Sequence, residues 1–251
     1  MPGAMPQPNF EPGEALIRYY DRLLQRLGPQ GWWPARTRLE VILGAILTQN
    51  TNWNNAALAL KRLRKAGLLE LARLRKASRA ELEACIRPAG FFRQKARAIR
   101  GFLDWLFTKH GGSLAKPFQH PAAALRRELL QINGLGVETA DAILLYAGRK
   151  PFFVADAYTR RIFSRHGLLL ASANYSQAQQ FLHRHLPPEH TLFNEFHALL
   201  VEVGKRYCKR HELQCSQCPL QEFLPGGREE RAMQLAGSSS EEAREPEFSS
   251  A

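Results

Sequence analysis

The chain of 251 residues is 45% hydrophobic, which is enough for a real core. No apolar run reaches the roughly 18 residues of a membrane-spanning helix, and the start, MPGAMPQPNF, lacks a signal-peptide pattern, so we expect a cytoplasmic protein without membrane contact. The chain has 35 Lys and Arg against 23 Asp and Glu, a net charge of +12 and a pI near 10.0. This charge favours nucleic acid as the partner. The alternative is a basic surface that only confers solubility.

Apolar residues recur with helical periodicity along most of the chain, and no alternating run of convincing length predicts a strand. We therefore predict an all-α fold, which at this length could form one large domain or two small ones. The predicted helices lie, in order, over residues 14–27, from 37 to 47, around Leu58 and Leu63, over 79–86, 93–107 and 125–132, from Ala140 to Ala147, from Ala157 onward, and over 177–185 and 193–207.

Two segments interrupt the first helices. Gly31-Trp32-Trp33-Pro34 lies outside any periodic pattern. Its tryptophans could fill the edge of a core, or their flat faces could stack on a base. The second segment, residues 48–55, is a cluster of polar side chains around Trp53, a composition that is typical of a loop with helix caps.

The stretch 129–163 carries the motif on which the functional prediction depends. It passes through Gly134-Leu135-Gly136 into a helix, and two glycines at a helix entrance allow positive φ and a close backbone approach. Amides at such an entrance can bind phosphate, although a tight turn without a ligand is the alternative. Further along, Asp156 precedes a basic helix, where an Asp is ordinarily an N-cap.

Three of the four cysteines are clustered. Cys208, Cys215 and Cys218 form the pattern C-x6-C-x2-C, which in a chain without a secretion signal indicates metal ligands rather than disulfides. The fourth, Cys85, lies in a distant predicted helix and is expected to be an ordinary buried thiol.

The pattern G-h-G-x-x-T-A-D-x-I-L, followed by h-x-D, resembles the helix-hairpin-helix plus Gly/Pro-Asp signature of the endonuclease III superfamily of DNA glycosylases (HhH-GPD), over roughly residues 30–222. The resemblance implies a two-domain helical fold with a cleft between the domains. A six-helix barrel domain is expected over 38–150, with its hairpin at 125–147. The second domain would combine 13–37 with 151–225 and hold the cysteine loop at 208–218. The Gly-, Ser- and Glu-rich tail, 226–251, is expected to be disordered.

The resemblance also assigns roles to single residues. Asp156 would be the catalytic carboxylate. Gly134, Gly136 and Thr139 of the hairpin would contact DNA, as would Lys95 in a segment similar to the family's GF-x-x-KA step. Gln49, in Leu-Thr-Gln-Asn-Thr, would enter the duplex and occupy the space that the flipped base leaves.

Two positions depart from the endonuclease III pattern. Enzymes of that type that also cut the strand carry a lysine two residues after the second glycine, where this chain has Glu138, so we predict a monofunctional glycosylase that uses water. Glu138 could also simply complement the helix dipole. The family's iron-sulfur loop has a fourth cysteine where this chain has Leu224. A 4Fe-4S cluster is therefore one expectation beside a three-iron form, a zinc site that uses His211, or a loop that only packs.

Trp32-Trp33-Pro34 and Leu47-Thr48-Gln49-Asn50-Thr51 look like the bacterial 3-methyladenine DNA glycosylase III group of this superfamily. That likeness implies a base pocket lined by Trp32, Trp33, Pro34 and Trp53, with Gln49 and Glu138 beside it. We therefore expect a nucleoid-associated monomer that binds duplex DNA and removes an alkylated purine. The alternatives are an endonuclease III-type glycosylase and lyase for oxidised pyrimidines, and a helix-hairpin-helix DNA-binding protein without catalysis.

Overall fold

The structure, a computed structural model, describes residues 11–224. The tail predicted to be disordered, 226–251, lies outside these residues. All regular elements of the described residues are helices, and these residues contain no strand, apart from one isolated bridge between Cys208 and Leu213. The all-α prediction is thus confirmed. No helix within this range combines the length and the apolar character needed to cross a membrane.

The chain divides into two compact units. Within the described range, unit 1 comprises residues 11–30, Ala155–Pro187 and 195–224, and unit 2 comprises Gly31–Val154 and Pro188–Asn194. The division differs from the expected one because residues 31–37, 151–154 and 188–194 group with unit 2. The side chains explain why: Trp33 packs on Trp53 and Tyr146, and the ring centroids of Phe153 and Phe193 lie 5.3 Å apart.

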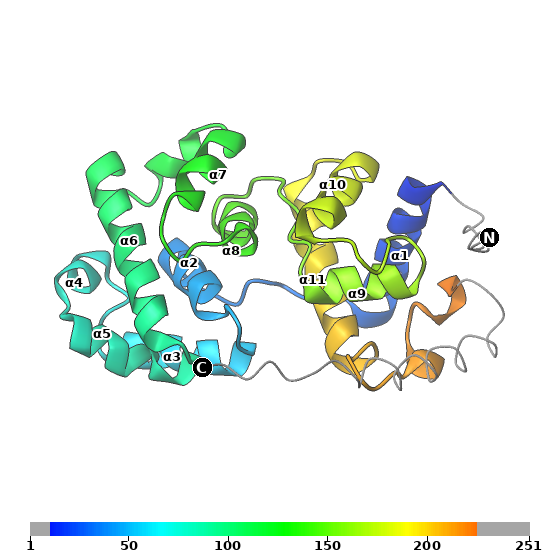
Figure 1. The fold of residues 1–251 in the computed structure, drawn as a ribbon, viewed down its shortest axis with the longest axis horizontal. Helices are drawn as coiled ribbons and strands as arrows, with labels where there is room; N and C mark the ends of the chain where they lie inside the picture. The colour runs from blue at the N-terminus through cyan, green and yellow to red at the C-terminus, as the bar shows by residue number, and fades with distance from the viewer. Residues whose placement is uncertain (1–10, 225–251) are drawn as a thin grey trace. The chain divides into compact units, whose positions relative to one another are not determined.

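Unit 2 is built around helix α2 (Arg38–Leu47), in which every residue from Leu39 to Leu47 is buried. Its sequence is apolar on nearly all sides, as expected for a central helix. Figure 1 shows α2 among α3, α6 and α8, and all three contact it, as does the π-helical turn η3. The other elements of the unit are α3 (Trp53–Lys65), α4 (Leu71–Lys76), α5 (Arg79–Ile86), η1 (Arg87–Ala89), α6 (Phe92–His110), η2 (Lys116–Gln119), α7 (Ala122–Leu130), α8 (Val137–Ala142) and η3 (Ile143–Ala147).

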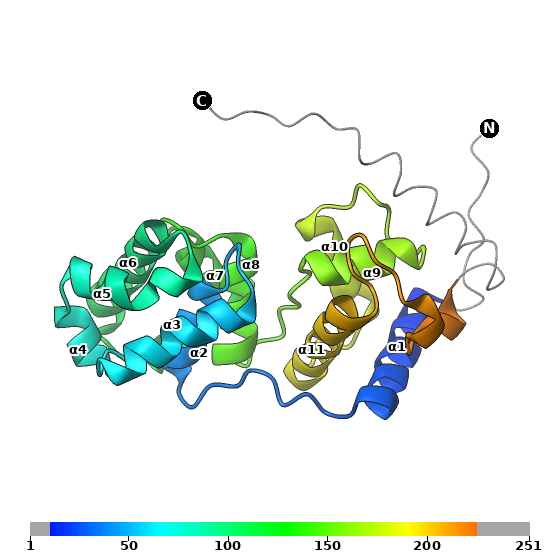
Figure 2. The same cartoon turned by 90° about the horizontal axis from the view of Figure 1, so that it is seen from below.

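Unit 1 consists of α1 (Pro12–Leu27), α9 (Ala157–Arg165), α10 (Tyr175–His185), most of α11 (His190–Arg206) and a C-terminal loop with the short turns η4 (Cys215–Gln217) and η5 (Gln221–Phe223). Helices α1 and α11 lie side by side (Figure 2), and the rings of Tyr20 and Phe196 meet edge to face at 5.7 Å. Phe163 of α9 packs on the same Phe196 at 6.1 Å. Aromatic side chains therefore hold α1, α9 and α11 around one core.

Candidate active site

Four aromatic rings from three separate segments meet in unit 2. The Trp32, Trp33 and Trp53 ring centroids lie 5.0–5.3 Å apart, and Tyr146 of η3 lies 5.1 Å from Trp33. All four side chains are partly exposed. We call these residues the aromatic cluster. The structure therefore brings the three predicted tryptophans together and adds Tyr146, which sequence reasoning missed.

Two features hold the tryptophan segment against α2. A Cβ at Gly44 would lie only 3.0 Å from the Trp33 indole, so the absence of a side chain lets the ring lie on the helix. The buried carboxylate of Glu40 accepts the Arg36 amide at 2.6 Å and pairs with Arg64 at 2.5 Å. Burial raises the pKa of Glu40, but these bonds outweigh burial and lower it. Pro34, between the cluster and this anchor, is exposed.

The two hairpin glycines have different structural roles. Gly134 has φ +89° and lies so close to α6 that a Cβ would be 2.9 Å from that of Ala98. Gly136 caps α8 with φ −82°, an extended conformation open to any residue, and among the described residues no atom lies within 4 Å of a Cβ placed there. Positive φ is therefore required at Gly134 only. The outer face of the turn at Gly136 is open.

Gln49 connects the polar loop after α2 to the hairpin. Its amide nitrogen donates to the Gly134 carbonyl at 2.9 Å and to the Thr139 hydroxyl at 2.7 Å. Thr139 is only 5% exposed. The Thr139 hydroxyl therefore lies under the turn and accepts the Gln49 amide, so the predicted DNA contact of Thr139 would have to come from its backbone at the start of α8.

Lys95 also has a different role from the predicted one. Its side chain is 2% exposed, and its ammonium donates to the carbonyl oxygens of Leu47 at 2.9 Å and Ala89 at 2.7 Å. Burial lowers the pKa of Lys95 to about 8. The prediction of a DNA contact is wrong: Lys95 fixes the ends of α2 and η1, directly before the loops that carry Gln49 and Phe91. Its spacing from Ile99 and Phe102, i+4 and i+7, places it on the buried face of α6.

Asp156 is the N-cap of α9, and both of its carboxylate oxygens face a partner in unit 1. Oδ1 accepts the Thr159 amide at 2.8 Å, and Oδ2 lies 3.5 Å from Nε2 of His197 on α11. Burial raises the pKa of Asp156, but the interactions with His197 and Thr159 outweigh it and hold the pKa below its ordinary value. The group is thus a mostly buried carboxylate, with 13% of its side chain exposed, that stays ionised at neutral pH. Sequence reasoning missed His197, which the helical pattern of α11 does not distinguish.

Glu138 lies in the first turn of α8 and is exposed. A carboxylate at this position complements the positive end of the helix dipole. The side chain at position 138 is a carboxylate, which cannot form an imine with the sugar.

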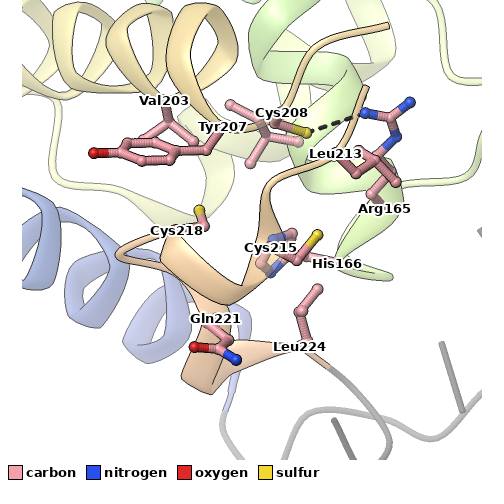
Figure 3. A pocket seen from close by; sticks show the side chains of 11 residues that line it. Arg165, His166, Val203, Tyr207, Cys208, Leu213, Cys215, Cys218, Gln221 and Leu224 are labelled. Atoms are coloured by element: carbon pink, nitrogen blue, oxygen red, sulfur yellow. Dashed lines mark hydrogen bonds between the residues drawn. The ribbon is translucent and has the colours of Figure 1, made fainter. Parts of the chain in front are cut away.

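The three clustered cysteines line one shallow, open pocket in unit 1 (Figure 3). Leu224, at the position of the fourth cysteine in endonuclease III-type loops, lines the same pocket. Within residues 11–224, no three His, Cys, Asp or Glu side chains are grouped so that they could hold a metal ion. The residues present therefore do not fit a cluster held by four thiolates, and His211 is exposed and is not among the residues that line the pocket.

Arginines of α9 hold the cysteine loop in place. Arg165 donates to Cys208 Sγ at 3.3 Å and to the Lys209 carbonyl at 2.7 Å, and Arg161 donates to the Cys208 carbonyl at 2.8 Å. Burial raises the pKa of Cys218 to about 11 and also raises that of Cys215, so both thiols are protonated at neutral pH. The loop thus has protein contacts that fix its conformation directly.

We expect the wild-type chain, purified without oxygen, to contain well under one 4Fe-4S equivalent of iron and acid-labile sulfide. Leu224→Cys supplies the missing thiolate and should raise both values toward four per chain, because four cysteines are the usual ligand set of this cluster. Leu224→Ser is the matched control, and it should leave both values unchanged. Four iron atoms per wild-type chain would contradict the prediction.

Known proteins of one family are similar to this chain over most of its length. Residues 43–188 match the model of the HhH-GPD superfamily base excision DNA repair protein. A Methanocaldococcus jannaschii protein, provisionally named DNA repair glycosylase MJ1434, is 42% identical over 212 residues, which are 84% of this chain and 96% of the relative. Endonuclease III of Sulfolobus acidocaldarius is 29% identical over 75% of this chain and 82% of its own length.

Solved structures of DNA glycosylases and endonuclease III share the fold of this chain. A non-covalent endonuclease III-DNA complex has a TM-score of 0.72 at 22% identity, covering 90% of this chain and 99% of that one. The 3-methyladenine DNA glycosylase of H. pylori, bound to 1,N6-ethenoadenine, has a TM-score of 0.67 at 27% identity, covering 78% and 98%. The all-α architecture, the hairpin with Asp156 after it and these matches lead to one conclusion: the chain belongs to the HhH-GPD superfamily of base excision DNA repair proteins.

Proposed function

We propose that this DNA repair glycosylase is monofunctional and hydrolyses the N-glycosidic bond of an alkylated purine, such as 3-methyladenine, in duplex DNA. The observation that carries the proposal is the aromatic cluster, in which four rings of unit 2 lie within 5.0–5.3 Å of a neighbour. The H. pylori relative, whose structure contains an etheno-purine, supports the same substrate class.

A flat cationic base suits such a pocket. Alkylation leaves 3-methyladenine positively charged, and a cation over indole or phenol rings gains about 0.5–2 kcal/mol. The charge also makes the base a good leaving group, so the pocket needs no acid to protonate it. The cluster consists of Trp32, Trp33, Trp53 and Tyr146, and none of them carries a carboxyl group. A neutral oxidised pyrimidine would gain less from these rings and would need more help to leave.

Asp156 would act on the sugar. Loss of the base builds positive charge on the ring, and a carboxylate that is already ionised and oriented stabilises that charge and the water that attacks it. The pKa of Asp156 lies below its ordinary value, because the contacts of His197 and Thr159 outweigh burial. Its negative charge is therefore available throughout the neutral range.

The hairpin and its neighbouring loops would hold the DNA. The turn exposes Asn133, Gly134 and Gly136, and the open space at Gly136 allows a phosphate backbone to approach closely. Phe91 is 61% exposed at φ +44° on a loop that Lys95 links to the loop of Gln49. Apolar side chains of this kind wedge between base steps while a nucleotide leaves the stack.

We propose that the protein works on chromosomal DNA in the cytoplasm as a monomer.

The proposal is tested by base release from duplexes that carry 3-methyladenine, 7-methylguanine, hypoxanthine or thymine glycol, each scored with and without alkali. We expect free alkylated base, with strand scission only after alkali, because Glu138 cannot form an imine. Borohydride trapping on the same duplexes should give no covalent adduct, with an endonuclease III as the positive control.

Two outcomes would overturn the proposal. A borohydride adduct together with thymine glycol release would favour the lyase activity for oxidised pyrimidines that the endonuclease III-named relatives suggest. Tight DNA binding without release of any base would instead favour a non-catalytic DNA-binding protein.

A further inference from the structure

We infer that His197 is a positioning residue for the Asp156 carboxylate, an inference that rests on the proposed function. His197 is only 7% exposed, and its Nε2 lies 3.5 Å from Asp156 Oδ2. The other carboxylate oxygen, Oδ1, accepts the Thr159 amide at 2.8 Å. The helix cap therefore fixes one oxygen, and an imidazole from another helix faces the second.

The packing of α9 on α11 determines where His197 lies. Gly204 follows His197 by seven residues and so shares its face of α11. A Cβ at Gly204 would overlap the side chain of Tyr158, so the absence of a side chain at Gly204 lets the tyrosine of α9 pack directly on α11. Arg161 of α9 donates to the Gly204 carbonyl at 3.3 Å and to the Cys208 carbonyl at 2.8 Å. These contacts fix the register of α11 against α9, and thereby hold the imidazole at the carboxylate.

Such an arrangement has a specific chemical consequence. A cap alone holds the carboxylate by a single hydrogen bond at Oδ1, so the plane of the group can still tilt about that bond and Oδ2 can still take up a proton. An N–H at Nε2, directed at Oδ2 across this 3.5 Å contact, would restrain the carboxylate and stabilise its ionised form, so the negative charge would already be oriented when the sugar becomes cationic. His197 touches neither base nor sugar in this role. A purely structural role, in which His197 only fills the space between α9 and α11, predicts a loss of stability without a specific effect on the chemical step.

Three variants separate the two roles. His197→Leu removes the donor, His197→Gln keeps an N–H donor at a similar reach, and His166→Leu is the matched control, since His166 is an equally buried histidine of unit 1 that contacts Tyr19. In single-turnover assays on 3-methyladenine DNA, His197→Leu should slow the chemical step about 10- to 100-fold with the DNA Kd unchanged, the size expected for a misplaced catalytic group. His197→Gln should restore most of the rate, and His166→Leu should leave it near wild type.

A second pair of measurements removes the remaining ambiguity. In the Asp156→Asn background, His197→Leu should slow the residual reaction less than about twofold, since the two residues act as one unit. Titration of the Asp156 carboxyl by carbon NMR should give a higher pKa in His197→Leu than in wild type, a readout that needs no base release. If the wild type releases no base, the proposed function fails. The NMR titration still tests whether His197 positions the Asp156 carboxylate. The positioning role of His197 would be overturned if His197→Leu and His166→Leu slowed base release equally, or if the pKa of the Asp156 carboxyl did not change in His197→Leu.

Discussion

Asp156→Asn is expected to reduce the rate of base release by about 10³-fold while the Kd for damaged DNA stays within a few-fold of wild type. The substitution removes the negative charge that stabilises the cationic sugar, and losses of this size follow when one preorganised electrostatic group is removed from an active site. Asparagine is nearly isosteric and caps helices as well as aspartate does, so α9 should keep its N-terminus. Single-turnover release of 3-methyladenine, together with a binding titration, measures both quantities.

Asp156 also has a structural role, because its Oδ1 accepts the Thr159 amide at 2.8 Å. A series of substitutions separates that role from catalysis. Asn and Ser both cap, whereas Ala does not, and the loss of a cap costs about 1 kcal/mol of stability. We expect Asn, Ser and Ala to be equally inactive, with only Ala clearly destabilised. If activity followed the order of capping instead, Asp156 would be a helix cap and not the catalytic carboxylate.

The sequence was sufficient to predict the helices whose apolar faces and caps agree. The helix predicted over 79–86 is α5, and the reason is local: Ser78 accepts the Glu81 amide and defines the first turn. Helix α4 was not predicted because it has six residues and buries only Leu74, which leaves no periodicity to detect. The bounds of α1 and α11 differ from prediction by two or three residues, where Pro12 and His190 extend the helices beyond their apolar stripes.

The candidate site was predictable only where a motif carried it. The three tryptophans and Asp156 were found from the sequence, since their residue types and neighbours are unusual. His197 and Tyr146 were missed because they matter through tertiary contacts with Asp156 and Trp33, across 41 and 113 positions of chain. Lys95 was predicted to contact DNA because it lies in a helix rich in basic residues, and all of these were expected to be exposed. A lysine in register with Ile99 and Phe102 needs buried acceptors, and only the fold shows that Leu47 and Ala89 provide them.

Asp141→Ala is expected to lower the free energy of unfolding by about 3–5 kcal/mol, the range for breaking a buried ion pair by removing one partner. Asp141 is fully buried in α8, and its two oxygens accept Arg126 Nε at 2.6 Å and Nη2 at 3.1 Å from α7. Without the carboxylate, the mostly buried guanidinium loses its bidentate partner and the two hairpin helices lose their clamp. Urea unfolding gives the free energy, and the melting temperature should fall by about 10 °C.

The surface pair Arg79–Glu83 provides the matched control for this prediction. It has the same 2.6 Å distance, but its arginine side chain is 64% exposed, so Glu83→Ala should cost no more than about 1 kcal/mol. The double variant Arg126→Leu/Asp141→Leu should recover more than half of the Asp141→Ala loss, because no buried charge then lacks a partner. If Asp141→Ala cost as little as Glu83→Ala, the pair would not clamp the hairpin. The turn at Gly134 and Gly136 would then depend more on its other contacts, among them the Gln49 hydrogen bonds and the packing of Gly134 on Ala98.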